Sequence, residues 1–408
     1  MGIKHDYDVV IVGAGPAGST CAIILGRMGY NVLLVDKARF PRDKACGDGV
    51  SGKSVAMLKE LGLLNQISSI ENLKCNGALV YLTTDIKIEL TSVAATGYTS
   101  KRIIYDNFLF ENAKELVDTL EEFTVTDLIL EDSKIAGIKG LDSATKKEME
   151  FSTKVVVGAD GANSVVANKM GLNKFEPRHR ASALRVYYKN LSGISNKLEI
   201  YFFDNIMPGY FWIFPLDNNM ANVGLGMLVN DMQKNKISLQ ELMFKEIEAN
   251  PILREKFRDA QMIEGSLRGW NLPFGSTHRK IYGNGFVLLG DAASLIDPFT
   301  GEGIGNAMLS AKVAAQVIDE AFRKGDLSEN SFKKYDALLW REIGKELKSS
   351  YTLQRIGTFL VKFKWLRNFM FKKAAKKPHL IQAVSASLVY EENQKKASPL
   401  KLLKDFIL

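Results

Sequence analysis

The chain has 408 residues, of which 46% are hydrophobic and 25% are charged, as in an ordinary globular protein with two or three core units. No stretch of about 18 apolar residues is free of charge, so we expect no membrane-spanning helix. Three cysteines and four histidines without metal-like spacing argue against an iron–sulfur cluster, a disulfide framework or a metal site.

The first forty residues have the pattern of a dinucleotide-binding unit. An apolar run ending at Val12 predicts a buried parallel strand, and a Gly-x-Gly-x-x-Gly turn (residues 13–18) follows it before a helical run. The glycines let a pyrophosphate approach backbone N–H groups at the N-terminus of a helix. A second strand ends at Asp36, whose carboxylate can accept hydrogen bonds from a ribose. This order of elements predicts a dinucleotide site.

Two further strands end in an acid and a glycine-rich turn. One leads to Asp160 and Gly161, and the other to Gly290 and Asp291, followed by a second glycine-rich turn (residues 298–305) and an apolar helix. The N-terminus of that helix offers amides and a positive dipole end to an electron-rich ring. Three such elements returning to one ligand fit the long FAD molecule better than NAD.

These three motifs together resemble the FAD-binding fold that is shared by aromatic hydroxylases of the p-hydroxybenzoate hydroxylase type, flavin-dependent halogenases and geranylgeranyl reductases. Residues 40–50, here called the Cys–Gly loop, resemble the corresponding loop of the geranylgeranyl reductase branch, which includes archaeal digeranylgeranylglycerophospholipid reductases and bacterial menaquinone reductases. Residues 209–215 resemble the aromatic signature of the same branch. Halogenases of this fold carry Trp-x-Trp-x-Ile-Pro, whereas this chain has Tyr210 where the first tryptophan stands.

The predicted fold class is α/β, with a Rossmann-like FAD-binding domain, an antiparallel-sheet substrate domain and a helical, basic C-terminal region. We expect the FAD-binding domain to comprise residues 1–74, 101–175 and 277–340. Residues 75–100 and 176–276 form the predicted substrate domain, because they alternate polar and apolar side chains. Residues 341–408 form the predicted C-terminal region.

The candidate site residues divide into a catalytic and a cofactor-binding set. Cys46, Tyr210 and Trp212 are the catalytic candidates; Cys46 is a proton donor or a redox-active thiol beside the flavin, because nearby cations favour the reactive thiolate. The alternative for Cys46 is a small residue chosen for fit. Arg102 is assigned to FAD because the resemblance implies it, and the alternative is a solvated surface arginine. The cofactor-binding candidates are Gly13, Gly15, Pro16, Ala17, Gly18, Asp36, Lys37, Cys46, Gly47, Arg102, Asp160, Gly161, Gly290, Asp291, Pro298, Gly301, Gly303 and Ile304.

The resemblance implies an FAD-dependent reductase that saturates C=C bonds of a geranylgeranyl or polyprenyl chain on a lipid or quinone by hydride transfer from flavin N5. The competing hypothesis is an FAD-dependent monooxygenase or halogenase that acts on an apolar or aromatic substrate. Only one complete glycine fingerprint is present, so the electrons must come from an external donor, such as NAD(P)H, a small electron carrier or another protein. An isolated prenyl double bond accepts a hydride when it is protonated to a tertiary cation or otherwise polarised. A dry, aromatic-lined site favours protonation, because ring faces stabilise positive charge. The aromatic residues between 187 and 214 offer more surface than a small polar substrate needs.

The formal net charge of +8 is concentrated late in the chain. Residues 359–377 combine seven cations with large apolar residues and contain no acid, a pattern typical of a membrane-surface segment. The alternative is a helix that docks its apolar face on the sheet domain, and both can hold together. No nucleic-acid-binding motif accompanies the charge. We therefore expect a cytoplasmic protein that contacts anionic lipid at the inner face of the cell membrane.

Overall fold

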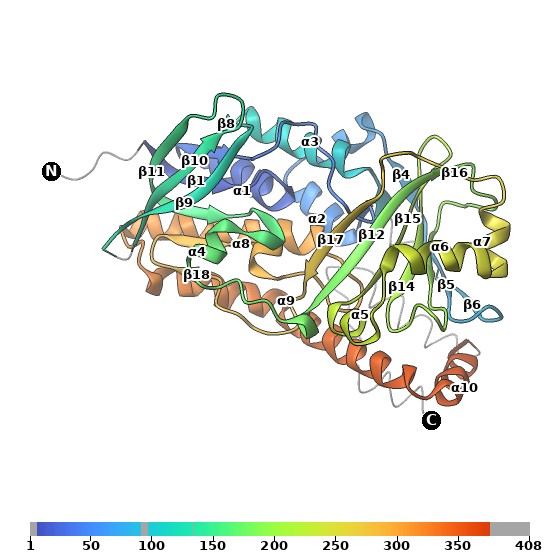
Figure 1. The fold of residues 1–408 in the computed structure, drawn as a ribbon. Helices are drawn as coiled ribbons and strands as arrows, with labels where there is room; N and C mark the ends of the chain where they lie inside the picture. Colours follow the sequence, from blue (N-terminus) through green and yellow to red (C-terminus); the bar gives the residue numbers. More distant parts are fainter. Residues whose placement is uncertain (1–5, 91–96, 133, 376–408) are drawn as a thin grey trace.

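The computed structural model describes residues 6–90, 97–132 and 134–375, and it contains two large sheets placed side by side (Figure 1). The first sheet has eight strands in the order β18-β19-β11-β1-β2-β8, with β10 paired to β11 and β9 paired to β10. Its strands are β1 (Tyr7–Val12), β2 (Val32–Val35), β8 (Asp118–Leu120), β9 (Phe123–Glu131), β10 (Lys134–Asp142), β11 (Glu148–Gly158), β18 (Tyr282–Gly283) and β19 (Phe286–Leu288).

The centre of the first sheet is parallel, because each strand returns through a crossover connection. Strand β2 and the last four residues of β1 are buried, as expected for a parallel sheet that is covered on both faces. Helix α1 (Pro16–Arg27) packs against α3 (Arg102–Lys114) and α8 (Ile304–Lys324). Cys21 on α1 is fully buried, so it is a packed core thiol.

The second sheet has the order β16-β12-β15-β14-β13-β5-β6, with β17 paired to β12. Its strands are β5 (Ala78–Tyr81), β6 (Lys87–Leu90), β12 (Arg180–Lys189), β13 (Leu198–Tyr201), β14 (Tyr210–Leu216), β15 (Met220–Leu228), β16 (Gln261–Met262) and β17 (Arg268–Pro273). One face packs against helices α5 (Val229–Asn235), α6 (Leu239–Ala249) and α7 (Pro251–Lys256), where Leu239, Met243 and Leu253 join its core. The opposite face is left to line a cavity.

Two details of the predicted second sheet differ from the structure. Strand β5 pairs antiparallel with β6 but parallel with β13, because a long segment of the other unit, which includes α3 and β8 to β11, separates β5 from β13 along the chain. The segments β4 (Leu73–Cys75) and β7 (Gly97–Thr99) form a separate three-stranded sheet with β3 (Gly49–Val50). The Thr99 hydroxyl donates a hydrogen bond to the Pro215 carbonyl, so this small sheet joins the Cys–Gly loop to β14.

The remaining helices lie outside the two sheets. These are α2 (Gly52–Glu60), α4 (Val165–Lys169), α9 (Glu329–Val361) and α10 (Lys364–Ala375), with short 3₁₀ turns η1 (Leu64–Ser69), η2 (Gly161–Asn163), η3 (Pro177–His179) and η4 (Gly290–Ala293). Helix α9 runs from the first sheet towards the second and leads into α10 (Figure 1). It passes residue 340, where we expected the FAD-binding domain to end, without a break.

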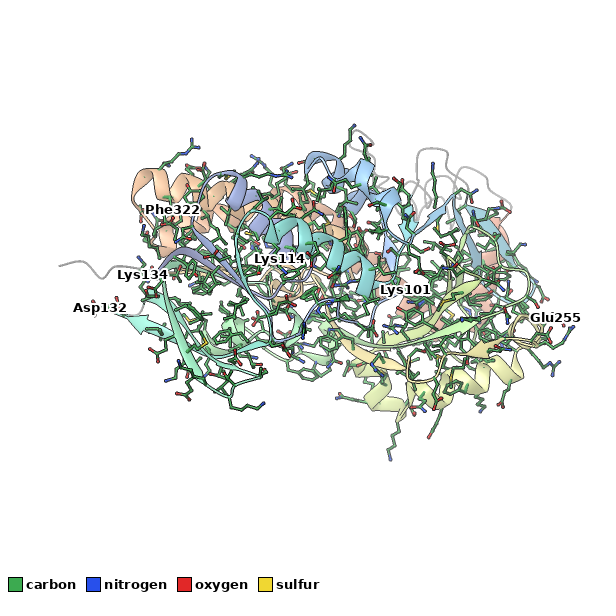
Figure 2. The ribbon with its side chains drawn as sticks, turned by 90° about the horizontal axis from the view of Figure 1, so that it is seen from above. Lys101, Lys114, Asp132, Lys134, Glu255 and Phe322 are labelled. Carbon is green, nitrogen blue, oxygen red and sulfur yellow. The ribbon has the colours of Figure 1, made fainter. Side chains whose placement is uncertain are left out.

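Seen from above, α3 lies between the labelled residues Lys101 and Lys114, and its Lys101 end is directed at the second sheet (Figure 2). Asp132 and Glu255 mark opposite ends of the molecule in the same view. Arg102, the first residue of α3, therefore lies where the two units meet.

Candidate active site

Three of the predicted acids lie at one edge of the first sheet. Strands β2, β1, β11 and β19 are adjacent and parallel, and their carboxyl ends carry Asp36, the glycine turn, Asp160 and Asp291 in that order. The Asp36 carboxylate accepts hydrogen bonds from the backbone N–H groups of Ala14 (2.8 Å) and Ala38 (2.9 Å). This edge is where open α/β sheets bind their ligands.

The glycines of the first turn have different tasks. Gly13 has a φ of +98°, and a Cβ atom there would lie 2.5 Å from the Ala159 carbonyl oxygen. A Cβ atom on Gly18 would lie 1.8 Å from the Gly13 oxygen, so both glycines are required by the fold itself. On Gly15 it would meet only the Arg42 guanidinium, at 3.5 Å. Gly15 thus leaves open space in front of the N-terminus of α1, as a pyrophosphate requires.

Asp160 has an unused hydrogen-bonding atom. One carboxylate oxygen accepts from the Val165 N–H at 2.6 Å, whereas Oδ1 is buried and has no partner in the protein. Burial raises the pKa of Asp160, and its hydrogen bonds to Ser164 and Val165 oppose the rise. Gly161 beside it has a φ of +79° and open space where a side chain would stand. A ligand that donates a hydrogen bond here would satisfy the orphaned oxygen, so the edge fits FAD.

A cavity of about 440 Å³ lies between the Cys–Gly loop, residues 297–303 and the open face of the second sheet. Its size is within the range of small-molecule sites. Eleven of the predicted site residues line it: Pro16, Cys46, Gly47, Arg102, Tyr210, Trp212, Asp291, Pro298, Gly301, Gly303 and Ile304. The other predicted site residues do not line the cavity but lie at or near the strand ends: Gly13, Gly15, Ala17, Gly18, Asp36, Lys37, Asp160, Gly161 and Gly290. Of these, Lys37 is exposed.

The aromatic signature forms the floor of this cavity. Because side chains alternate along β14, Tyr210, Trp212 and Phe214 face the cavity, whereas Phe211 and Ile213 enter the core of the second sheet. The Tyr210 hydroxyl donates to the Thr300 carbonyl at 2.9 Å, which ties the sheet to the turn before α8. A Cβ atom on Gly47 would lie 3.1 Å from the Phe214 ring, so the loop backbone rests directly on these rings.

Arg102 is not a solvated surface residue. It is 3% exposed and donates from Nε and one Nη to the two carboxylate oxygens of Asp106 at 2.6 and 2.7 Å. Arg42 donates to the same carboxylate at 2.6 Å. Burial alone would raise the pKa of Asp106, but the two guanidinium groups outweigh it and hold that pKa below 3.8. The Arg102 guanidinium also interacts with the Cys46 side chain.

Five polar residues in or behind the cavity wall were not singled out from the sequence. Lys53, Glu302 and Glu346 line the cavity, whereas Asp48 and Asn222 are fully buried behind its lining. Buried Lys53 donates to Asn306 at 2.6 Å and pairs with Glu346 at 3.2 Å, and Glu302 accepts from Ser51. Burial raises the pKa of Glu302, and Lys53 opposes that rise. Two features of the sequence could have drawn attention to the two residues behind the lining. Asp48 is an acid between two glycines, and Asn222 is the one amide side chain in an otherwise apolar strand.

The family described as the FAD binding domain matches residues 6–337 of the chain. With the open glycine turn and the orphaned Asp160 oxygen, this match makes FAD the cofactor and the protein an FAD-dependent oxidoreductase. The chain is also 32% identical over 352 residues to digeranylgeranylglycerophospholipid reductase 1 of Methanococcoides burtonii, an alignment covering 85% of this chain and 82% of that protein. The protein therefore belongs to the FAD binding domain family and, within it, to the geranylgeranyl reductase branch.

Solved structures agree with this assignment. A geranylgeranyl bacteriochlorophyll reductase-like protein of Thermoplasma acidophilum has a TM-score of 0.79 and 27% identity, covering 98% of this chain and 95% of its own. The flavin-dependent brominase Bmp2 has a TM-score of 0.76 and 22% identity, with coverage of 98% and 97%. At that identity the brominase shows only that the fold is shared.

Proposed function

We propose that the protein reduces C=C bonds in the isoprenoid chain of a lipid or quinone, with an external donor, NAD(P)H or a small electron carrier, supplying the electrons. The observation that carries this proposal is the aromatic and aliphatic cavity that adjoins the FAD edge. Leu198 and Ile200 of β13, with Phe202 directly after the strand, extend its lining next to the rings of β14. FAD, when bound and reduced, supplies a hydride to carbon.

The chain's own residues would hold the isoprenoid chain, exclude water and supply the proton. Apolar side chains from β13, β14 and β17 replace water around the substrate, and the ring faces of Tyr210 and Trp212 stabilise charge that develops at the reacting carbon. Cys46 stands beside them as the proton donor or redox-active thiol. Asp36, Asp160 and the Gly15 turn would hold the sugar and phosphate parts of FAD at the strand ends.

The proposal extends to the membrane because an isoprenoid chain of several units is insoluble in water. None of the described helices is long and apolar enough to cross a bilayer. Instead, the end of α9 and helix α10 expose large apolar side chains: Phe359 (55%), Phe363 (41%), Trp365 (73%) and Phe369 (57%). Gln354, Gly357 and Thr358, in the preceding turns of α9, line the cavity. The exposed aromatic residues would therefore enter the bilayer surface beside the route to the cavity.

The two alternatives for residues 359–377, contact with the membrane surface and docking on the sheet domain, are compatible in this arrangement. Arg367 is 3% exposed and pairs with Asp204, and Lys364 pairs with the same carboxylate, so two cations dock α10 on the loop after β13. Lys362 and Lys372 are exposed and available to anionic headgroups. Lys376 and Lys377, which belong to the predicted segment, lie outside the described residues.

A product assay tests the proposal. Photoreduced holoprotein is mixed without oxygen with a geranylgeranyl glycerolipid or a prenylated quinone, and the extracted lipid is analysed by mass spectrometry. We expect each saturated bond to add the mass of two hydrogen atoms. Unchanged lipid under these conditions, together with oxygen-dependent hydroxylation or halogenation of an aromatic compound, would support the competing function.

A further inference from the structure

The Cys–Gly loop itself carries a buried carboxylate, and the chemistry proposed above does not use it. Asp48 is 0% exposed and has left-handed backbone, with a φ of 62°. One of its oxygens accepts from the Tyr187 hydroxyl at 2.8 Å and from the Asn222 amide at 2.7 Å. The other accepts from the Arg102 backbone N–H at 3.2 Å. Asp48 thus contacts both units and α3.

Asn222 connects this carboxylate to both sides of the cavity. Its amide nitrogen donates to Asp48 and also to the backbone carbonyl of Cys46 at 2.7 Å. Its amide oxygen accepts from the Trp212 indole N–H at 2.8 Å. These three bonds use both donors and one acceptor of the amide, so the orientation of Asn222 is fixed by its partners.

Neighbouring charges hold the rest of the loop. Arg185 on β12 is 1% exposed, lies over the Tyr187 ring and donates to Asp43 at 2.7 Å and to the Lys44 carbonyl. Lys44 in turn pairs with Asp291 at 3.2 Å. Tyr187 and Arg185 from β12 are the titratable or charged side chains that face Asp48, and α3 contributes the backbone N–H of Arg102.

We infer that Asp48 and Asn222 are positioning residues that fix the Cys46–Gly47 backbone against Trp212, so that the flavin side and the substrate side of the cavity keep one spacing. The inference rests on the proposed function in taking Cys46 and Trp212 as those two sides. Asp48 and Asn222 do not themselves react; they act through the loop and the indole that they hold.

The cost of keeping a charge at this position supports the inference. Burial raises the pKa of Asp48 to about 6, although Arg185 and the bonds from Asn222 and Tyr187 oppose the rise. At neutral pH the carboxylate is ionised, and in that form its two oxygens accept hydrogen bonds from Tyr187, Asn222 and the Arg102 N–H. Protonation would place a hydrogen on one of these oxygens and remove an acceptor from the cluster.

Labelling of the Cys46 thiol tests the inference without any substrate. Cys21 and Cys75 are 0% and 3% exposed, so a thiol reagent applied to the folded holoprotein reacts first at partly exposed Cys46. Tyr187→Phe removes one bond to Asp48 and leaves all charges in place. We expect it to increase the labelling rate at least tenfold, and Asp48→Asn to increase it further. Tyr188→Phe is the matched control, since it removes a hydroxyl from the next residue on the same strand.

The kinetic readout separates positioning from folding. We expect Tyr187→Phe to bind FAD and to lower kcat at least fivefold, with a smaller change in KM. In Asp48→Asn, the fall in activity of the native protein near pH 6 should be absent. Labelling rates and kcat values of Tyr187→Phe that match those of the native protein and of Tyr188→Phe would overturn the inference. Failure of the native protein to reduce any isoprenoid would instead reject the proposed function. The labelling rates would still test whether Asp48 and Asn222 hold the loop, because that assay needs no substrate.

Discussion

Removing the Asp106 carboxylate should destabilise the junction between the two units more than any surface ion pair. Asp106 is 0% exposed and receives three short charge-assisted hydrogen bonds, two from Arg102 and one from Arg42. In Asp106→Asn the shape is kept, but the buried Arg102 guanidinium loses its counter-charge. Breaking a buried pair in this way costs about 3–5 kcal/mol.

Chemical denaturation of the holoprotein and the FAD-free protein measures this cost. The matched control is Asp127→Asn, which removes the carboxylate of the exposed Asp127–Lys169 pair and should leave the unfolding midpoint unchanged. The pKa of Asp106 is lower in the folded protein than in the unfolded chain. Its contribution to the free energy of unfolding is therefore present above pH 3.8 and is lost as the pH falls below that value. The difference between the native protein and Asp106→Asn should therefore shrink in acid. If the free energy of unfolding of Asp106→Asn at pH 7 is lower than that of the native protein by less than about 1 kcal/mol, the reasoning is refuted.

Four further predictions follow from the site and the surface. Cys46→Ser should keep the fold and FAD while turnover falls at least tenfold, about 1.4 kcal/mol of barrier, and full activity would make the thiol structural. Gly15→Val should fold, because the space there is open and the backbone is extended, but should purify without yellow FAD. Because the pKa of Asp48 is raised to about 6, the native protein should lose about 3 kcal/mol of its free energy of unfolding as the pH rises from 3.8 through about 6. Asp48→Asn should lack this loss, and a variant whose free energy of unfolding follows the same pH dependence as the native protein would contradict the prediction. Phe369→Ser should weaken salt-sensitive flotation with anionic vesicles, whereas Phe175→Ser, at a similarly exposed phenylalanine, should not, and equal binding of both would reject the membrane contact.

The FAD edge was predictable because its signals are local. A strand, a glycine turn and a strand-end acid are encoded within a few residues of one another, and parallel pairing then brings Asp36, Asp160 and Asp291 together. Tyr210 and Trp212 could be assigned to one face because strand alternation is also local. The same pattern could not show that Lys37 is exposed, or that Arg102 is paired with Asp106 one helical turn later.

The polar cluster that joins Asp48 of the Cys–Gly loop to the second sheet could not be predicted, because its members are far apart in the chain. Asp48 and Asn222 are 174 residues apart, and no short motif states that an amide in β15 will meet a loop after β2. The parallel pairing of β5 with β13 was missed for a related reason, since it depends on the direction in which the chain re-enters the second sheet. Residues 376–408 lie outside the described structure, so the predicted basic segment is only partly described.

The most direct measurement is the reoxidation of the reduced flavin without oxygen, followed by its absorbance in stopped flow. Native holoprotein is photoreduced and mixed with a geranylgeranyl glycerolipid in anionic vesicles, with the fully saturated lipid as control. The reductase account predicts that the oxidised flavin spectrum returns with the unsaturated lipid, with one C=C bond lost per flavin, and that the saturated lipid leaves the flavin reduced. A flavin that stays reduced with every unsaturated isoprenoid, and is reoxidised only by dioxygen, would contradict the account.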